Sequence, residues 1–214
     1  MDTKIHSIAT GKSKEYTISQ KKFQSAYKKD ILHLSIDADT LGLKNDFQVD
    51  KRYHGGVDKA IHIGSTQHFE LFEKEYNLKL DPLAIGCNIF ITNYSEEDIC
   101  VGDIYSIGEA LIEVSQPRQP CWKIGALFGK EVSRYIAKNQ ATGWYVRVLQ
   151  EGTISLKDTL QLKKRVTNIN MKELSIYLHT PPQNAARIEE ILHTASLADS
   201  YKKDFLQVLG TNNS

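Results

Sequence analysis

Hydrophobic and polar positions alternate over many short stretches in the first three quarters of the chain. Leu32, Leu34 and Ile36 are separated by single polar residues, which is the period of a half-buried strand. Further strands are expected at residues 4–9, 60–63, 88–92, 104–107, 110–114, 144–149, 154 and 160–162. Helical spacing interrupts them over residues 66–76 and 131–139. Many short strands with few helices predict a mainly β fold that closes as a mixed β-barrel.

The hydrophobic period changes near the C-terminal end. Asn170 and Glu173 form the pattern of a capping box, which opens a helix. Apolar stripes over residues 185–195 and 198–209 predict two more helices, with Gly210 placed as the C-cap of the last one. These three short helices are expected to form a small unit of their own.

The two patterns divide the chain into a β-barrel domain over residues 1–165 and a three-helix C-terminal unit over residues 166–214.

The 214 residues are 41% hydrophobic and 25% charged, an ordinary globular composition. Lysine and arginine total 27 against 26 for aspartate and glutamate, so no global charge indicates nucleic acid or an anionic membrane as a partner. Three cysteines, Cys87, Cys100 and Cys121, cannot form a complete disulfide framework. With no signal-peptide pattern and no membrane-length apolar run, the sequence predicts a reducing cytoplasm.

The stretch SQPRQPCWK carries the most suggestive chemistry in the chain. Pro117 and Pro120 hold the backbone extended, because each ring fixes its own φ and biases the preceding residue away from helix. Cys121 follows at once, with Arg118 and Lys123 on either side. Positive charge favours the thiolate, the form that attacks carbon or binds a soft metal. An isolated cysteine is usually a small apolar core residue, so composition alone favours that interpretation, and the two-proline setting favours a reactive thiol.

A second stretch combines glycine with positive charge. Gly55 and Gly56 allow a sharp turn or a close approach to a ligand, and Arg52 and His54 just before them could meet an anionic group. On local sequence alone, a turn with solvated charges is the simpler interpretation. The lysines that flank residues 23–27 are likewise interpreted as a solvated segment. The zinc, P-loop, dinucleotide-binding and nucleophile-elbow motifs are all missing from the sequence.

Four segments together resemble the MOSC domain family, named for the C-terminal domain of molybdenum cofactor sulfurase. They are residues 52–60, 102–103, 114–123 and 143–149. The sequence is most similar to bacterial members linked to resistance against N-hydroxylated base analogues such as 6-N-hydroxylaminopurine. The similarity extends to about Arg165, and the C-terminal helices resemble the three-helix appendage of this subgroup.

The resemblance implies a β-barrel that binds the molybdenum cofactor (molybdopterin), with Cys121 as the thiolate ligand to molybdenum. The residues that it implies as cofactor contacts are Arg52, His54, Gly55, Gly56, Asn88, Gln116, Arg118, Lys123 and Arg147. The implied reaction is a two-electron reduction of the N–O bond of an N-hydroxylated small molecule. The implied electron donor is a flavoprotein or haem protein, and no nucleic acid or membrane partner is expected.

The sequence departs from the family pattern at two places. Residues 86–88 read Gly-Cys-Asn where the family commonly has Gly-Glu-Asn, so Cys87 replaces a carboxylate and weakens any role that needs a general acid there. Asn45-Asp46 stands where the family tends to have Gly-Asp, a change that affects a turn. If Cys87 lies near Cys121, the two thiols could form a disulfide. Alternatively, Cys87 packs under Ile85 and Ile89 as a small apolar side chain.

Two other functions remain open for Cys121. In a sulfur-relay or cofactor-carrier protein, it would hold a persulfide or pass the cofactor on without turnover. In a metal-free Cys-His hydrolase, it would be the nucleophile beside a distant histidine, although sequence spacing cannot establish that the two meet.

Overall fold

A computed structural model describes residues 3–81 and 83–212 of the chain. The strands are β1 (Thr3–Thr10), β2 (Lys14–Ile18), β3 (Lys21–Ser25), β4 (Asp30–Leu32), β5 (Ile36–Asp39), β6 (Gly42–Leu43), β7 (Ile61–Ser65), β8 (Ile89–Ile91), β9 (Ile104–Ile107), β10 (Ala110–Pro117), β11 (Trp144–Gln150), β12 (Gly152–Ile154) and β13 (Thr159–Lys164). The helices are α1 (Lys51–His54), the 3-10 turn η1 (Val57–Lys59), α2 (Gln67–Tyr76), α3 (Trp122–Phe128), α4 (Lys130–Asn139), α5 (Met171–Tyr177), α6 (Ala185–His193) and α7 (Asp199–Asn212).

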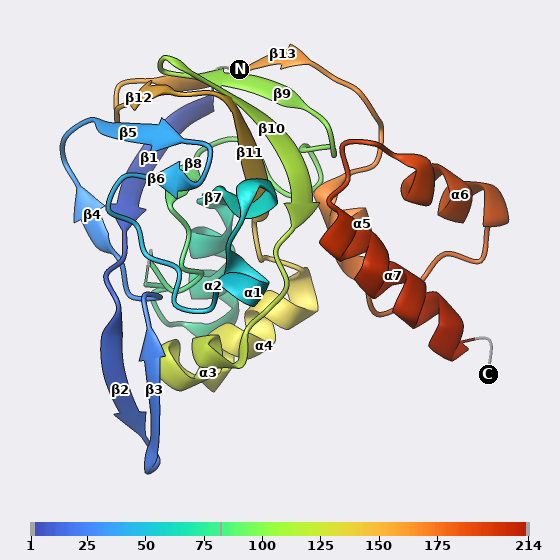
Figure 1. The fold of residues 1–214 in the computed structure, drawn as a ribbon. Coiled ribbons are helices and arrows are strands. Elements are labelled where there is room, and N and C mark those ends of the chain that lie inside the picture. Colours follow the sequence, from blue (N-terminus) through green and yellow to red (C-terminus); the bar gives the residue numbers. More distant parts are fainter. Residues whose placement is uncertain (1–2, 82, 213–214) are drawn as a thin grey trace.

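Seven strands close a mixed β-barrel, as the sequence predicts (Figure 1). Their order is β13-β9-β10-β11-β7-β8-β1, and β1 closes the ring by pairing with β13 at Thr3↔Leu160. The pairing of β7 with β8 is parallel, and the other pairings in the ring are antiparallel. Closure leaves the barrel without open edges, except where the short β4 extends β1.

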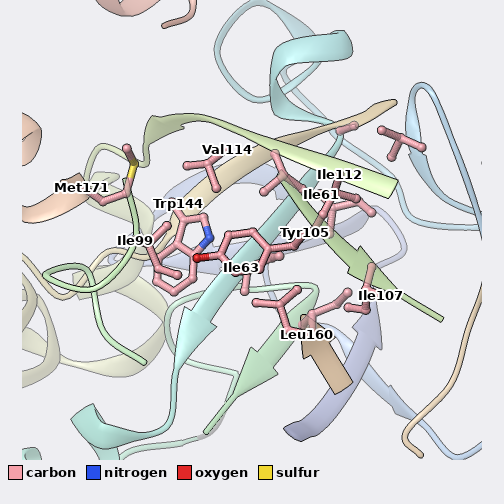
Figure 2. Close-up of a cluster of buried hydrophobic side chains, with 14 of the residues drawn as sticks. Ile61, Ile63, Ile99, Tyr105, Ile107, Ile112, Val114, Trp144, Leu160 and Met171 are labelled. Carbon is pink, nitrogen blue, oxygen red and sulfur yellow. The ribbon is translucent and has the colours of Figure 1, made fainter. Parts of the chain in front are cut away.

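The barrel interior is filled by apolar side chains from alternate strand positions. Ile61, Ile63, Ile112 and Val114 lie in this core, which also holds the ring of Tyr105 (Figure 2). All of them are almost fully excluded from solvent. The alternation of inward and outward residues is what makes the strands readable from the sequence.

The C-terminal helices pack on one side of the barrel, beside the end of β10 (Figure 1). They share the barrel's core: Met171 lies near Trp144 and Ile99 in Figure 2, and the three belong to one buried cluster. The predicted cap of α5 is confirmed, because Asn170 Oδ1 accepts from the Glu173 amide at 2.8 Å. None of the helices that the structure describes is long and apolar enough to span a membrane.

Gly210 is not a C-cap. Helix α7 continues through it to Asn212, and a Cβ at Gly210 would meet no atom within 4 Å. An exposed glycine in a last helical turn lowers helix propensity without ending the helix. The predicted cap is therefore wrong.

Two local predictions near the N-terminus also differ from the structure. The predicted strand through Leu34 is split: β4 ends at Leu32, β5 begins at Ile36, and Leu34 is 80% exposed between them. The segment interpreted as solvated turns inward after β3, so that Ala26 and Lys29 are buried. The reason is a buried ion pair between Lys29 and Asp46, a partner that lies too far along the chain for local sequence to reveal.

Candidate functional site

One cavity brings together the residues that carry the chemistry. It encloses about 590 Å³, including its open mouth, and it lies between the segment after β3, the segment before α1 and the loop after β10. Five of the predicted site residues line it, namely His54, Asn88, Arg118, Cys121 and Lys123. The lining that the sequence did not predict includes Tyr27, Lys29, His62 and Tyr145.

Cys121 lines the cavity from the loop that follows β10. Strand β10 shifts register against β11 between Val114 and Gln116, so a bulge precedes the proline loop. The backbone of Cys121 is extended (φ −114°, ψ 140°), and this residue is the N-cap of α3. Its side chain is half-buried, with no disulfide partner. The loop that contains Pro117 and Pro120 therefore places a free thiol in the cavity wall.

Arg118 is buried in the cavity wall without a carboxylate partner. The residue is 4% exposed, and its guanidinium lies 5.0 Å from the ring centroid of Tyr27. Its Nη1 atom is buried and has no hydrogen-bond partner in the structure. A buried donor that lacks a partner typically costs about 1–3 kcal/mol, and more when charged. This donor is therefore suited to an anionic group bound in the cavity.

The other charges of the lining add to this positive character. Lys59 Nζ donates to the Tyr53 carbonyl at 2.9 Å, and Lys123 Nζ donates to the Gln24 carbonyl at 3.0 Å. Backbone carbonyls do not neutralise a lysine. By contrast, Lys29 is paired with a buried aspartate. The charges that remain without a contacting counter-charge at the cavity are therefore cationic.

Two histidines of the lining are neutral at neutral pH. Burial, with Arg118 and two lysines nearby, lowers the pKa of His54 to about 4. Burial also lowers the pKa of His62 well below its ordinary value. Nδ1 of His54 lies 3.3 Å from the Tyr145 hydroxyl, and Nε2 of His62 lies 2.8 Å from the Thr142 carbonyl. Both rings thus serve as hydrogen-bonding groups rather than as cations.

Five predicted contacts lie outside the cavity lining. The Arg52 side chain is 80% exposed and pairs with Asp50 at 2.9 Å. Gly55 and Gly56 form the turn between α1 and η1, where Gly56 has φ +93°. Gln116 is buried and accepts from the Ser200 hydroxyl at 2.8 Å.

Arg147 also lies outside the lining and has a structural role. Its guanidinium pairs with Asp58 at 2.5 Å and with Glu113 at 2.8 Å, and it donates to the Ser196 carbonyl at 2.7 Å. These bonds join the barrel to the C-terminal helices. Its Nε and Nη1 donors are thus already bonded to protein groups.

The two departures from the family pattern have simple local explanations. Cys87 is fully buried beside Ile85 in a second apolar cluster, and burial raises the pKa of its thiol. It packs among apolar side chains and is not part of the cavity lining that the structure describes, but its Sγ lies 3.5 Å from Nε2 of His62, which does line the cavity. Asn45 has φ +64°, a left-handed conformation that asparagine tolerates better than other non-glycine residues. Asp46 accepts from the Gly11 amide at 2.7 Å and from Lys29, so the turn places a buried carboxylate.

What sequence reasoning missed is mostly aromatic or comes from outside the motif segments. Tyr27 donates to the Ile85 carbonyl at 2.8 Å, and this bond holds its ring against Arg118. Lys29 requires a partner 17 residues away. His62 and Tyr145 lie on strands that were predicted, but an alternation pattern does not say which end of a strand faces a cavity.

Comparisons with known proteins support a family assignment. Residues 50–161 match the MOSC domain. The uncharacterized protein YflK of Bacillus subtilis is 31% identical over 205 residues, which cover 95% of this chain and 93% of that protein. The crystal structure of YiiM from Geobacillus stearothermophilus superimposes with a TM-score of 0.79 at 30% identity, covering 97% and 99% of the two chains. A Gibberella moniliformis protein named "Reductase" is 37% identical over 118 residues, which are 52% of this chain and 21% of that protein.

Proposed function

The chain belongs to the MOSC domain family, and from this premise we propose that its cavity binds a molybdenum cofactor with Cys121 as the ligand to the metal. We further propose that the loaded protein reduces N-hydroxylated small molecules, such as N-hydroxylated bases. When bound, the cofactor supplies the two-electron chemistry of N–O bond reduction. A flavoprotein or haem protein of the cytoplasm would deliver the electrons.

The observation that carries this proposal is a free thiol in the same cavity as a buried guanidinium whose Nη1 has no partner. Cys121 and Arg118 line the same cavity, and Arg118 Nη1 has no hydrogen-bond partner. Thiolate is the protein ligand preferred by soft metal–sulfur centres, and guanidinium is the group that best matches phosphate. The donor set therefore fits a cofactor that carries both a metal and a phosphate.

The remaining lining residues have roles in binding and orientation. Lys59 and Lys123 attract the anionic part of the cofactor, and their charges are not cancelled by a contacting carboxylate. The neutral rings of His54 and His62 offer hydrogen bonds without adding charge. The reductase assignment is supported by the relative named "Reductase", which shares about half of this chain.

The test is molybdenum content of protein purified from a host that makes the cofactor. Wild-type protein should contain about one molybdenum per chain, and Cys121→Ser should lose it while the fold is kept. Cys100→Ala is the matched control, because Cys100 is buried outside the cavity lining. Equal molybdenum in wild type and Cys121→Ser, at equal circular dichroism, would contradict the proposal.

A sulfur-relay or carrier role is the alternative that the same measurement separates. A persulfide on Cys121 would appear as cyanide-labile sulfur in protein that holds no molybdenum. Bound molybdenum together with reduction of an N-hydroxylated base by an artificial electron donor would instead support the reductase.

A further inference from the structure

A buried polar network lies behind the cavity wall and belongs to none of the motif segments. Glu96, on the loop after β8, is 3% exposed, and its Oε2 lies 2.9 Å from Nε2 of His68 on α2. The other ring nitrogen of His68 lies 3.1 Å from the hydroxyl of Tyr135 on α4. His68 is itself 7% exposed, and Tyr135 is 1% exposed. The carboxylate thus pairs with a histidine of α2 that Tyr135 of α4 holds in turn.

The second oxygen of Glu96 holds the turn that precedes β11. Glu96 Oε1 accepts from the Gly143 amide at 2.9 Å. Gly143 has φ +69°, and a Cβ there would lie 2.2 Å from the Ile63 carbonyl oxygen and 2.9 Å from His62 Nε2. The backbone at this point therefore needs glycine, and the carboxylate satisfies the amide that the turn buries.

The same turn contacts two residues of the cavity. The Gly143 carbonyl accepts from the Arg118 amide at 3.1 Å, and the preceding Thr142 carbonyl accepts from His62 Nε2 at 2.8 Å. Nδ1 of the same ring lies 3.4 Å from the Gly86 carbonyl. A carbonyl can only accept and a neutral ring has one proton, so the shorter contact, to Thr142, places that proton on Nε2. The Thr142–Gly143 turn consequently sets both the backbone position of Arg118 and the tautomer of His62.

We propose that Glu96, held by His68 and Tyr135, is the positioning residue that fixes the Thr142–Gly143 turn and thereby orients Arg118 and His62 toward the cavity. The proposal rests on the proposed function only for the identity of the anion that Arg118 receives. A carboxylate is rarely fully buried, and apolar residues fill a core at lower cost when packing alone is needed. The burial of the Glu96 carboxylate is explained by its hydrogen bond from the Gly143 amide.

The experiment compares Glu96→Ala and Glu96→Gln with wild type. Leu80→Ala is the control for a general loss of packing, because Leu80 is buried in the apolar cluster that also contains Tyr135. The first readout is the His62 ring Nε2–H signal in 15N–1H NMR spectra and its rate of exchange with water, assigned with His62→Gln. The second readout is the affinity of the cofactor-free protein for inorganic phosphate by calorimetry.

We expect Glu96→Ala to speed exchange of the His62 proton at least tenfold and to weaken phosphate binding about tenfold, the loss typical of one charge-assisted hydrogen bond. Glu96→Gln should restore most of the protection of the His62 proton and most of the phosphate affinity, because the glutamine oxygen still accepts from the Gly143 amide. Leu80→Ala should change neither, although it lowers the melting temperature.

Three outcomes would overturn the proposal: unchanged proton exchange in Glu96→Ala, equal effects of Leu80→Ala, or no recovery in Glu96→Gln. The ring-proton readout needs no cofactor and no metal. A wild-type protein that protects the His62 proton but never binds molybdenum would therefore reject the proposed function and leave this inference standing.

Discussion

Arg118 and Arg52 show how burial separates two arginines that their motifs present alike. Arg118 precedes Cys121 and Arg52 precedes the Gly55-Gly56 pair, and both were expected to contact the cofactor. In the structure, Arg118 is 4% exposed with an unpartnered Nη1, whereas the Arg52 side chain is 80% exposed and paired with Asp50. A surface ion pair typically contributes only about 0–1 kcal/mol, and a buried cation that receives an anion contributes more. Substitution of the two residues should therefore affect phosphate binding and cofactor retention to different extents.

We predict that Arg118→Lys weakens phosphate binding and cofactor retention about tenfold or more, because a lysine cannot reproduce the planar guanidinium donors. Arg52→Ala should leave both nearly unchanged, contrary to the expectation from sequence alone. Calorimetric titration with phosphate and metal analysis of purified protein measure the two effects. Equal losses in the two variants would place Arg52 in the site despite its exposure.

His54 should make stability depend on pH. Its pKa falls to about 4 in the folded protein, mainly through burial, so the unfolded chain binds a proton more readily between about pH 6.5 and 4. Folding stability should therefore be fully present above pH 6.5 and decrease as pH falls through this window, by on the order of 2 kcal/mol. Urea unfolding of wild type and His54→Gln at pH 7.0 and 5.0 measures this difference. An equally steep pH dependence in the variant would assign the effect to other groups, such as His62.

Cys87 and Cys121 should differ in reactivity. Cys87 is fully buried and burial raises its pKa, whereas Cys121 is half-buried at the cavity wall. Iodoacetamide should therefore alkylate Cys121 first in the cofactor-free protein, and mild oxidation should give no Cys87–Cys121 disulfide. Peptide mass spectrometry of both reactions is the measurement. A crosslinked peptide would show that the loop of Cys87 opens toward the site.

At the scale of elements, regular alternation made the barrel strands predictable and long-range partners made the rest unpredictable. Strands β7 to β11 were expected because each buries alternate side chains or a continuous apolar run. Helix α3 was missed, since a seven-residue helix directly after Pro120 carries too short a pattern to recognise. Lys29 and Glu96 became site or supporting residues through partners 17 and 47 residues away, and no local pattern contains that information.

Two glycines test how elements depend on backbone conformation. Gly143→Ala should destabilise the protein by at least about 2 kcal/mol, because φ is positive and the new Cβ would meet the Ile63 carbonyl. Gly210→Ala should stabilise it by about 0.5–1 kcal/mol, since α7 continues through an unobstructed position. Chemical unfolding gives both free energies. A destabilising Gly210→Ala would mean that the last turn of α7 is not helical in solution.

At the scale of the whole molecule, the residues that match the MOSC domain span less of the chain than the residues that build the main buried cluster. The match ends at residue 161, whereas the main buried cluster continues to Phe205. Seven buried side chains in that cluster come from beyond Arg165: Ile169, Met171, Leu174, Ile191, Leu197, Tyr201 and Phe205. The division at residue 165 follows the change in hydrophobic period, and it runs through a shared core.

The C-terminal helices also contact the loop that carries the thiol. Ser200 donates to the Gln116 side chain at 2.8 Å, and Gln119 donates to Asp204 at 2.9 Å. Both acceptor–donor pairs flank the Arg118 segment. Helix α7 therefore holds the segment that precedes Cys121 from outside the barrel.

We predict that a chain ending at Arg165 does not fold stably, in contrast to the separable unit that the sequence suggests. Fully burying one large apolar side chain contributes about 1.5–3 kcal/mol, so losing seven of them removes as much as the whole stability of a typical domain, about 5–15 kcal/mol. A chain ending at Leu209 is the control, because it keeps all seven side chains. Thermal unfolding followed by circular dichroism and molybdenum content should both separate the two. A chain ending at Arg165 that unfolds cooperatively and still binds molybdenum would show that the barrel is independent and that the helices only cover it.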